Sequence, residues 1–481
     1  MKRKSIFLLI LLFTSTIFSQ TFFESLEPGE NQIAVYVASC DWGPCIEKVV
    51  AHTKITFEPD SPYLKDFEID RLIYQQGSTM GIAKGELTIT EVFVSDSKGN
   101  KVNTPSNYVT MLTDVYPDAE NSNPFISNSA SSIFELYYSY RVQNDSLNIN
   151  IPNVQGFVCK DVSKFSQKSF EHKMLLQDVE MEVNLKYMFY LPETNSEKKI
   201  PLILWFHGLG ESGTNPYLVL LGTKSSALAG PKIQSYFENG IAILAPQCPS
   251  GWLETTEVGA MGIRYWAPVD IDAPIKKITN PVKKFFNKIF EFEGRKNPEP
   301  EEDPFAAVSY YTEPVTALLY DFLEAHPEID RDRIYVGGCS AGGYMTMNMM
   351  IQHSDIFAAA FPTCEYYLDS KITDSQIKEL AQKPLWFTYS LNDTTVKPEN
   401  CCIPTIKRLK IAGAKNLKIS EFPNVIDLTG KYYKNRKAKK DDDDFEKPFE
   451  YDGHYSWIYV LDDLCYDENE SLFEWLSHQS K

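Results

Sequence analysis

The second half of the chain repeats one pattern, in which short and continuously apolar runs alternate with stretches of helical periodicity. The apolar runs include PLILWFHG (201–208), AILAPQCP (242–249), RIYVGG (333–338) and PLWFTYS (384–390). A strand that is apolar on both faces is buried on both faces, which occurs mainly in parallel sheets covered by helices. Because a helix usually connects two parallel strands, the alternation predicts an α/β fold with a mostly parallel sheet between two helical layers.

The first part of the chain has a different rhythm and predicts a separate domain. Between about residues 28 and 158, β-rich runs such as QIAVYVAS (32–39) and SLNINIP (146–152) follow one another without helical stretches. Several short strands in such a length are typical of a β-sandwich, here of an immunoglobulin-like kind. No group of catalytic residue types lies in this region. We therefore expect an accessory domain at 28–158, followed by a catalytic domain at 170–480.

The first 19 residues have the composition of an export signal. Lys2, Arg3 and Lys4 precede an apolar run at 6–13, and the small residue Ser19 ends the stretch. This order is typical of a signal peptide, and the apolar run is shorter than the ~20 residues that a membrane-spanning helix needs. We expect residues 1–19 to be removed and the mature protein to be exported, to the periplasm or the cell exterior.

The net charge and the cysteine content indicate which classes of partner and cofactor this protein is not expected to bind. The chain has 47 Lys and Arg against 65 Asp and Glu, a net charge of −18, which disfavours nucleic acid as a partner. The nine cysteines fit no zinc-binding spacing, and we predict no metal and no cofactor. Cys40 and Cys45 flank a short loop and have the spacing to close a small ring, but the sequence does not determine disulfide pairing or oligomeric state.

An insertion at about 270–304 interrupts the alternation of strands and helices. Within it, the stretch 276–292 places Phe285, Phe286, Ile289 and Phe290 at helical spacing opposite several lysines. A basic amphipathic helix of this kind packs on its own domain, closes over a site as a lid, or contacts a membrane. We favour the first of these, and membrane contact is not favoured.

The motif Gly338-Cys339-Ser340-Ala341-Gly342 lies between the predicted strand RIYVGG and a predicted helix. In this G-x-S-x-G arrangement, a sharp turn between strand and helix exposes the serine hydroxyl and needs small residues on both sides. Ser340 is therefore the candidate nucleophile.

A serine hydroxyl reacts only when a base removes its proton and a carboxylate orients that base. In this type of fold the chain order is Ser, acid, His. His454 lies in a loop between the last predicted strand and the last helix, where the base is expected. Asp393 follows the strand PLWFTYS and is the preferred carboxylate. Asp452 is the alternative, but it is only two residues from His454 and is poorly placed to reach the far nitrogen of the ring.

The tetrahedral intermediate of such a reaction needs backbone N–H donors aimed at its oxyanion. One donor is expected from Ala341, directly after the nucleophile. The other is expected from the loop His207-Gly208-Leu209-Gly210-Glu211, where we choose Leu209 and keep Gly208 as the alternative. In this arrangement His207 shapes the loop and is not the base.

Five segments together resemble secreted bacterial α/β-hydrolase esterases of the prolyl-oligopeptidase-like and feruloyl-esterase-like group. They are PLILWFHGLGESG, APQCP with the following Trp252, DRIYVGGCSAGGYMTMNM, LNDTTV and GHYSW. The resemblance covers about residues 170–480 and implies an α/β-hydrolase fold and a serine carboxylesterase with Ser340, Asp393 and His454 as its triad. Several members of the group carry an immunoglobulin-like domain ahead of the hydrolase. Some fungal feruloyl and tannin esterases have a disulfide between cysteines that lie beside the Ser and the His. This chain has Cys339 before Ser340 but Gly453 before His454, so that disulfide cannot form.

The expected function is hydrolysis of an ester in a small molecule or linked to a polysaccharide, with carbohydrate-linked acetyl or feruloyl esters as candidates. Aromatic residues near the predicted loops are candidates for stacking on such a substrate, although aromatic residues are also ordinary core residues. They are Trp252, Tyr265, Trp266, Tyr366, Tyr367 and Trp457. The alternatives are a serine peptidase of the prolyl oligopeptidase type, a lipase or phospholipase with a lid, and a binding protein that has lost catalysis.

Overall fold

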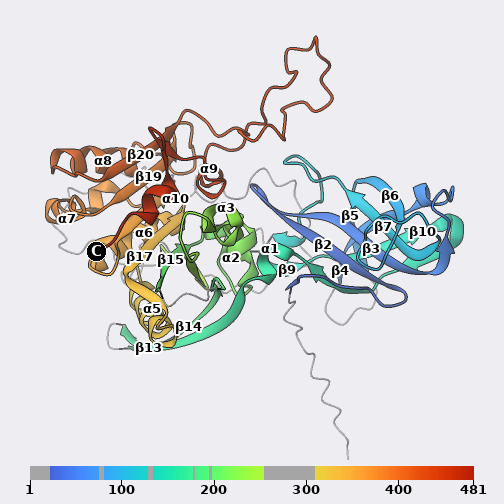
Figure 1. Cartoon of the computed structure of the whole chain (residues 1–481), viewed down its shortest axis with the longest axis horizontal. Helices are drawn as coiled ribbons and strands as arrows, with labels where there is room; N and C mark the ends of the chain where they lie inside the picture. Colours follow the sequence, from blue (N-terminus) through green and yellow to red (C-terminus); the bar gives the residue numbers. More distant parts are fainter. Residues whose placement is uncertain (1–21, 75–80, 128–133, 177–178, 194–197, 254–308) are drawn as a thin grey trace, which may run out of the picture.

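The computed structural model of this protein describes residues 22–74, 81–127, 134–176, 179–193, 198–253 and 309–481 (Figure 1). Most of its strands form one large sheet in the later part of the chain and two smaller sheets in the earlier part, and β8-β9 and β21-β22 (Tyr466–Asp467 and Glu470–Ser471) form two-stranded sheets. The large sheet has eight strands, and the smaller sheets have six and four. The signal segment 1–19, the insertion 270–304 and its amphipathic stretch 276–292 lie outside the described residues.

The eight strands of the large sheet follow the order β13-β14-β16-β15-β17-β18-β19-β20. From β16 to β20 neighbouring strands are parallel, whereas β14 is antiparallel to both β13 and β16. The bounds are β13 Ser166–Leu176, β14 Val179–Tyr190, β15 Ile200–Phe206, β16 Ala242–Gln247, β17 Ile329–Cys339, β18 Ala359–Thr363, β19 Leu385–Ser390 and β20 Leu417–Phe422. The carboxyl ends of β17, β19 and β20 therefore meet at one edge, where the site is built.

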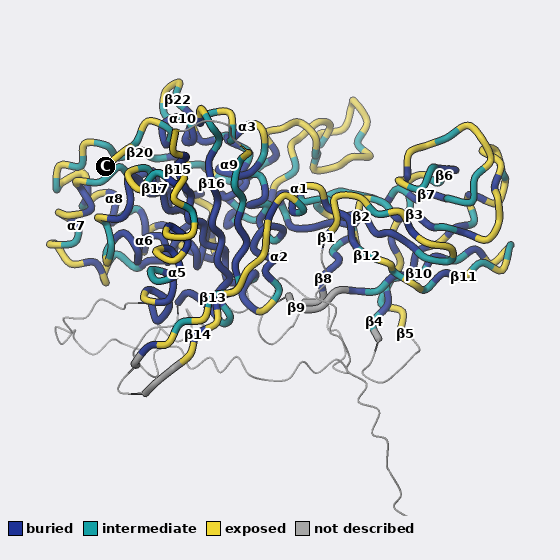
Figure 2. Tube along the Cα trace, turned by 60° about the horizontal axis from the view of Figure 1, so that its bottom comes forward, coloured by how far each residue is buried: buried dark blue, intermediate teal, exposed yellow. Residues whose placement is uncertain are grey.

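Every residue of β15 is buried, because the strand faces a helical layer on each side. Leu202, Leu204 and Phe206 join one hydrophobic cluster, and Ile203 and Trp205 join another. This alternation follows from the pleat of a strand, whose successive side chains point to opposite faces. Figure 2 shows these central strands in the colour of buried residues.

Helices cover the two faces of the large sheet. The face of Leu204 packs against α5 (Thr312–Ala325), α6 (Ala341–His353), α7 (Asp374–Leu380) and α8 (Cys402–Ile411). The face of Trp205 packs against the shorter helices α2 (Tyr217–Leu221), α3 (Pro231–Gln234), α9 (Trp457–Leu461) and α10 (Leu472–Ser477). The predicted α/β arrangement with helices on both faces is confirmed.

The first half of the described chain contains the six-stranded sheet β1-β12-β2-β3-β7-β6 and the four-stranded sheet β11-β10-β4-β5. Apolar residues of both sheets, among them Val35, Val49, Ile69 and Val142, lie in one hydrophobic cluster. The bounds are β1 Phe22–Phe23, β2 Gln32–Cys40, β3 Gly43–Phe57, β4 Glu68–Tyr74, β5 Gly81–Glu86, β6 Ile89–Ser95, β7 Ser106–Thr113, β10 Ser139–Asn144, β11 Ile149–Ile151 and β12 Val154–Val158. The short strands β8 (Phe125–Ser127) and β9 (Phe134–Tyr137) pair with each other, and α1 (Lys160–Ser163) leads into the large sheet.

The two halves share a continuous interface. The cluster on the Trp205 face also contains core residues of the first half, such as Val35 and Ile69. Within this interface, the largely buried Lys224 ammonium lies 2.5 Å from the carboxylate of Asp41 and 2.6 Å from that of Asp462. The first half therefore packs against the segments that cover this face of the large sheet, with Phe22 against Tyr217 of α2 and Trp457 of α9 donating to the Asp41 backbone oxygen.

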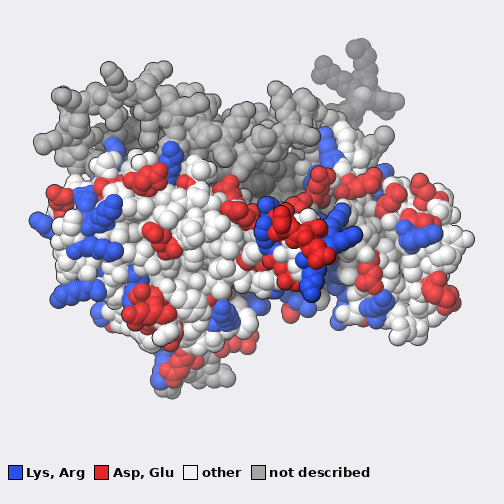
Figure 3. Space-filling model, turned by 90° about the horizontal axis from the view of Figure 1, so that it is seen from above, with Lys and Arg blue, Asp and Glu red and all other residues white. Residues whose placement is uncertain are grey.

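A long loop between β20 and α9 reaches from the large sheet to the first half of the chain (Figure 1). Its Arg436 guanidinium pairs with the Asp114 carboxylate at 2.6 Å, and the Tyr116 hydroxyl donates to the backbone oxygen of Tyr433 at 2.7 Å. Figure 3 shows basic and acidic side chains intermixed over this loop. No helix among the described residues combines the length and the apolar character needed to cross a membrane.

Candidate active site

Ser340 lies at the turn between β17 and α6, in a backbone conformation that few residues other than glycine adopt. Its φ is 58° and its ψ is −118°. The two glycines of the motif permit this turn because the backbone approaches them closely. An added Cβ would lie 2.5 Å from the Phe206 oxygen at Gly338 and 2.1 Å from the same atom at Gly342. The turn therefore packs against the end of β15 and projects the Ser340 hydroxyl beyond the edge of the sheet.

The structure brings Ser340, His454 and Asp393 into one hydrogen-bonded chain. The Nε2 atom of His454 lies 2.8 Å from Ser340 Oγ, and its Nδ1 atom lies 2.7 Å from Asp393 Oδ2. All three residues are buried, with exposed fractions of 5%, 3% and 4% for Ser340, His454 and Asp393. Because Nδ1 faces a carboxylate, Nδ1 carries the proton in the neutral ring and Nε2 is free to accept the proton of Ser340.

The two candidate carboxylates have different partners. Asp393 uses its second oxygen, Oδ1, to accept the backbone N–H groups of Thr395 and Val396, each at 2.8 Å. These bonds fix the carboxylate in the loop after β19. Asp452 instead accepts the backbone N–H of His454 at 3.0 Å and shapes the turn that carries the histidine. The structure therefore pairs the imidazole with Asp393, the preferred candidate.

The loop that carries His454 fits closely against the loop that carries Asp393. A Cβ at Gly453 would lie 2.3 Å from Asn392 Oδ1 and 2.5 Å from the Asn392 backbone oxygen. Glycine is thus the residue that allows these two loops to approach. On its other side, the His454 ring meets the edge of Trp457, with ring centroids 5.5 Å apart and planes at 90°.

The predicted oxyanion donors lie on either side of Ser340. Ala341 is the first residue of α6, and Leu209 begins the short 3-10 helix Leu209–Glu211 after β15. Neither N–H group has a hydrogen-bond partner among the described residues. The N–H of Gly208, the alternative, interacts with the Cys339 thiol and the Glu211 carboxylate. These neighbours make Gly208 the less accessible of the two donors, and we keep Leu209 as the preferred one.

His207 holds the loop after β15 from behind. Its Nε2 accepts the Cys248 N–H at 2.9 Å, so Nδ1 carries the proton and donates to the Gly208 backbone oxygen at 2.6 Å. The residue is fully buried, and burial lowers the pKa of its imidazole to about 4. A neutral ring with both nitrogens engaged shapes the loop and cannot serve as the base for Ser340.

Two buried glutamates near the site were not singled out by the sequence. Glu211 closes the loop after β15, and burial raises the pKa of its carboxyl to about 7. Glu365 follows β18, where burial raises the pKa of its carboxyl to about 8. Its Oε2 accepts the Tyr367 N–H, and its Oε1 has no partner among the described residues. A glutamate after a Gly-rich loop is usually exposed, so the sequence around Glu211 does not predict that it is buried. The structural sign of its burial is the close approach of Gly222, which lies in another segment.

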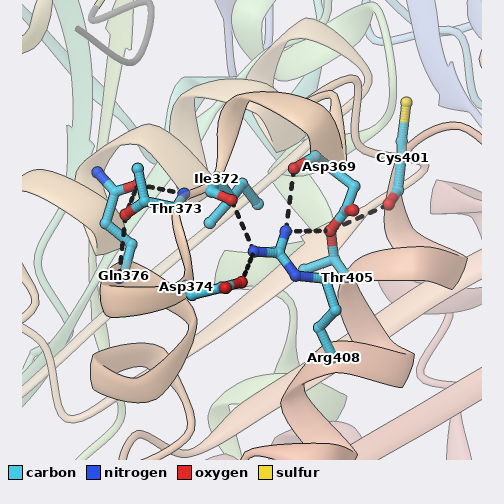
Figure 4. Close-up of polar contacts among 8 residues, drawn as sticks. All are labelled: Asp369, Ile372, Thr373, Asp374, Gln376, Cys401, Thr405 and Arg408. Atoms are coloured by element: carbon cyan, nitrogen blue, oxygen red, sulfur yellow. Dashed lines mark hydrogen bonds and ion pairs between the residues drawn. The ribbon is translucent and has the colours of Figure 1, made fainter. Parts of the chain in front are cut away.

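The segment after β18 is fastened to α8 by Arg408 (Figure 4). The guanidinium donates to Asp369 Oδ1 at 3.0 Å, to Asp374 Oδ1 at 2.7 Å and to the backbone oxygens of Asp369 and Ile372. Thr405 donates to the same Asp369 oxygen at 2.9 Å. This network gives the segment that carries Glu365 a fixed position beside the first turn of α6.

The candidate aromatic residues are mostly part of the core. Trp252 is fully buried and donates to the His207 backbone oxygen at 3.0 Å, so it supports the loop and offers no surface for stacking. Tyr366, Tyr367 and Trp457 are also buried, and Tyr265 and Trp266 lie outside the described residues. Within the described ranges, no group of three His, Cys, Asp or Glu side chains is placed to hold a metal ion.

Comparison with known proteins identifies the fold. A sequence model of the prolyl oligopeptidase family matches residues 316–367, a short part of the chain that includes Ser340. A crystal structure of a thermostable esterase matches 93% of this chain and 99% of its own, with 20% identity and a TM-score of 0.60. An S-formylglutathione hydrolase from Agrobacterium tumefaciens matches 66% of this chain and 96% of its own, with 14% identity and a TM-score of 0.35. No curated protein matches.

These similarities carry different weight. The TM-score of the S-formylglutathione hydrolase, 0.35, is too low to support an argument. At 20% identity the thermostable esterase establishes the fold and not the activity. In this chain, the parallel strands of the large sheet and the position of Ser340 in a turn between β17 and α6 are typical of that fold. The second half of this chain therefore has the α/β-hydrolase fold, as predicted.

Proposed function

We propose that this protein is an exported serine hydrolase that cleaves carboxylic esters through an acyl-enzyme. The observation that carries the proposal is the chain of hydrogen bonds from Asp393 through His454 to Ser340, 2.7 Å and 2.8 Å long. The similarity in fold to a thermostable esterase over 99% of that protein supports an ester as the substrate. The composition of residues 1–19 supports export.

In the first half of the proposed reaction, Ser340 Oγ attacks the ester carbonyl carbon while its proton moves to His454 Nε2. Asp393 holds the opposite N–H and stabilises the imidazolium that forms. The carbonyl oxygen becomes an oxyanion, which the N–H groups of Leu209 and Ala341 stabilise together with the positive end of α6. The tetrahedral intermediate then collapses, His454 gives its proton to the departing alkoxide, and the alcohol leaves.

In the second half, water hydrolyses the acyl group on Ser340. His454 Nε2 takes a proton from the water as its oxygen attacks the acyl carbon, and the same two N–H groups stabilise the new oxyanion. Collapse of this intermediate breaks the bond to Ser340 Oγ, which recovers its proton from His454. The acid is released and the site returns to its starting state.

We propose a small-molecule or polysaccharide-linked ester as the substrate, with acetyl or feruloyl groups on a carbohydrate as the acyl half. The first test is hydrolysis of p-nitrophenyl esters from acetyl to palmitoyl, together with methyl ferulate, by the wild type and by Ser340→Ala. A preference for acetyl or feruloyl esters that disappears in the variant would support the proposal. A preference for long chains would instead favour a lipase and direct attention to the stretch 276–292 as a lid.

The same variant tests the mechanism. Ser340→Ala is expected to lower kcat by at least 10⁴-fold, because the nucleophile is lost. A melting temperature close to that of the wild type would show that the fold is retained. A fluorophosphonate probe should label the wild type and not the variant. Wild-type turnover in Ser340→Ala would exclude Ser340 as the nucleophile.

A serine peptidase is the second candidate, because residues 316–367 match the prolyl oligopeptidase family. A peptidase uses the same three side chains and the same intermediates on an amide, so the site alone does not separate the two activities. Peptide p-nitroanilides assayed beside the esters distinguish them. A kcat/KM for an anilide that exceeds the best ester value would favour the peptidase.

A further inference from the structure

Glu211 is a buried acid placed beneath the loop that carries the expected oxyanion donor. Its side chain is enclosed, with an exposed fraction for the residue of 6%. Its Oε2 lies 3.0 Å from the position that a Cβ on Gly208 would occupy. The N–H groups of Gly208 and of Glu211 itself interact with its carboxylate. The carboxylate thus lies against Gly208, the residue next to Leu209.

The charge of Glu211 is placed among groups of the site. The Cys339 thiol on β17, the His454 imidazole and the Tyr455 hydroxyl in the following turn all interact electrostatically with it. A buried carboxylate is costly unless polar groups compensate for lost water. The mechanism above assigns Glu211 no bond to make or break, so its burial calls for another explanation.

Space for Glu211 is provided by a glycine from another element. Gly222 follows α2, and a Cβ on it would lie 2.4 Å from Glu211 Cγ and 2.5 Å from Glu211 Oε1. The φ of Gly222 is −62°, a helical value that alanine adopts easily. Glycine is therefore needed at this position for the room it leaves to Glu211 and not for its backbone conformation.

We infer that Glu211 is a positioning residue that holds Gly208, and through it the adjoining Gly208–Leu209 peptide, in the orientation that aims the Leu209 N–H at the oxyanion. This inference rests on the proposed function of Ser340. The carboxylate interacts with the Gly208 N–H, which belongs to the peptide before Gly208. The Gly208 oxygen belongs to the peptide with Leu209, and it accepts from the His207 ring at 2.6 Å and from the Glu211 N–H at 3.3 Å. Both peptides around Gly208 are therefore held, and the Leu209 N–H is held with them. An oxyanion donor contributes only when it is aligned before the reaction begins.

The test compares variants of Glu211 that differ in the hydrogen-bond acceptor they place next to the Gly208 N–H. Glu211→Leu removes the acceptor, Glu211→Gln keeps an acceptor oxygen without charge, and Glu211→Asp draws the carboxylate back by one methylene. Turnover is measured with p-nitrophenyl acetate. The affinity for phenylboronic acid is measured in parallel, because its adduct with serine places an oxygen where the oxyanion forms.

We expect Glu211→Leu to lower kcat about 10²-fold with a nearly unchanged KM, because removal of one oxyanion donor costs 10²–10³ in kcat. The inhibition constant of phenylboronic acid should rise by a similar factor. Glu211→Gln should keep kcat within about threefold, and Glu211→Asp should lose about tenfold. If Glu211→Leu does not fold, the kcat values of Glu211→Gln and Glu211→Asp test the inference.

Gly222→Ala approaches the same question without altering Glu211. We expect it to lower kcat with an unchanged KM in the wild-type background and to have little effect in Glu211→Ala, where the clash is absent. Asp70→Asn is the control for stability, because it weakens a buried ion pair with Arg141 in the four-stranded sheet. It should lower the melting temperature without changing kcat.

Three results would overturn the inference. They are a wild-type kcat in Glu211→Leu, an equal loss in Glu211→Gln and Glu211→Leu, or a loss that appears in KM and not in boronate affinity. A wild type that neither hydrolyses esters nor reacts with a fluorophosphonate would instead refute the proposed function. The two failures are therefore distinguishable.

Discussion

Ser340 has a backbone conformation that costs a non-glycine residue of the order of 1–3 kcal/mol, and its surroundings must supply that energy. The Ser340 N–H donates to the Thr363 oxygen at 3.0 Å, and Gly338 and Gly342 let the turn press against β15. At this scale the site depends on single atoms in fixed places. Substitutions that shift such atoms by about 1 Å should affect catalysis more than stability.

The two aspartates near His454 provide a matched pair. Asp393→Asn is expected to lower kcat by about 10⁴-fold, because an amide at this position favours the wrong imidazole tautomer. Asp452→Asn should lower kcat less than tenfold, because an asparagine oxygen can still accept the His454 N–H. Steady-state kinetics on p-nitrophenyl acetate checks both. Equal losses in the two variants would contradict the assignment of Asp393.

Gly453 offers a test of how tightly His454 is placed. Gly453→Ala puts a methyl group 2.3 Å from the present position of Asn392 Oδ1, so one of the two loops must move. We expect a loss of about 10²-fold in kcat and a slower reaction with a fluorophosphonate probe. A variant that keeps the wild-type rate would show that the His454 loop adapts without consequence.

At the scale of elements, apolar pattern and chain order predicted most of the large sheet. β15, β16, β19 and the last part of β17 appear in the sequence as mainly apolar runs, because a central strand is buried on both faces. β17 itself begins earlier, at Ile329, with charged residues that the apolar pattern did not include. The hairpin β13–β14 was not predicted. It is the edge of the sheet, and its residues Lys168, Glu171, Lys173 and Glu182 break the apolar pattern.

Chain order and local pattern also explain which residues of the site could be predicted from the sequence. Ser340 and Asp393 directly follow strand ends, and His454 lies in the loop after β20, in the chain order Ser, Asp, His, so the sequence could predict all three. Glu211 and Gly222 meet through packing between segments that no pattern links. The shorter helices α2 and α3 were missed because helices of four or five residues leave little periodicity to detect.

The contact between the segment after β18 and α8 depends on Arg408. Arg408→Lys should lower the free energy of unfolding by about 1–3 kcal/mol, because an ammonium cannot reach two carboxylates and two backbone oxygens together. Urea denaturation measures the free energy of unfolding. The effect of the substitution on kcat, expressed as a free energy, should be smaller than its effect on unfolding. An unfolding free energy equal to that of the wild type would show that the network in Figure 4 contributes little.

For the molecule as a whole, buried acids make stability depend on pH. The pKa of the Glu365 carboxyl rises from 4.5 to about 8 on folding, so its contribution is complete below pH 4.5 and is lost as pH increases through 8. The melting temperature should therefore fall between pH 5 and 8 more steeply in the wild type than in Glu365→Gln. Scanning fluorimetry between pH 5 and 8 measures both melting temperatures. If the melting temperatures of the wild type and of Glu365→Gln change equally with pH, the prediction is wrong.

The interface between the two halves should contribute to global stability. Lys224→Met leaves the carboxylates of Asp41 and Asp462 close together without their cation, and we expect a loss of about 3–5 kcal/mol. Lys198→Met is the control, because its pair with Glu238 is exposed and should contribute less than about 1 kcal/mol. Equal effects of the two substitutions on urea denaturation would contradict this role for Lys224.

The hydrophobic cluster that joins both halves has a practical meaning for anyone who wants to divide this protein. In the sequence, the two halves look like separable domains that could be expressed or exchanged independently, with a boundary near residue 160. In space, the first half packs against the short helices α2 and α9 that cover one face of the hydrolase sheet. A catalytic fragment expressed alone would expose that apolar surface to water, and we expect it to aggregate. Useful grafts would have to carry the covering residues with them.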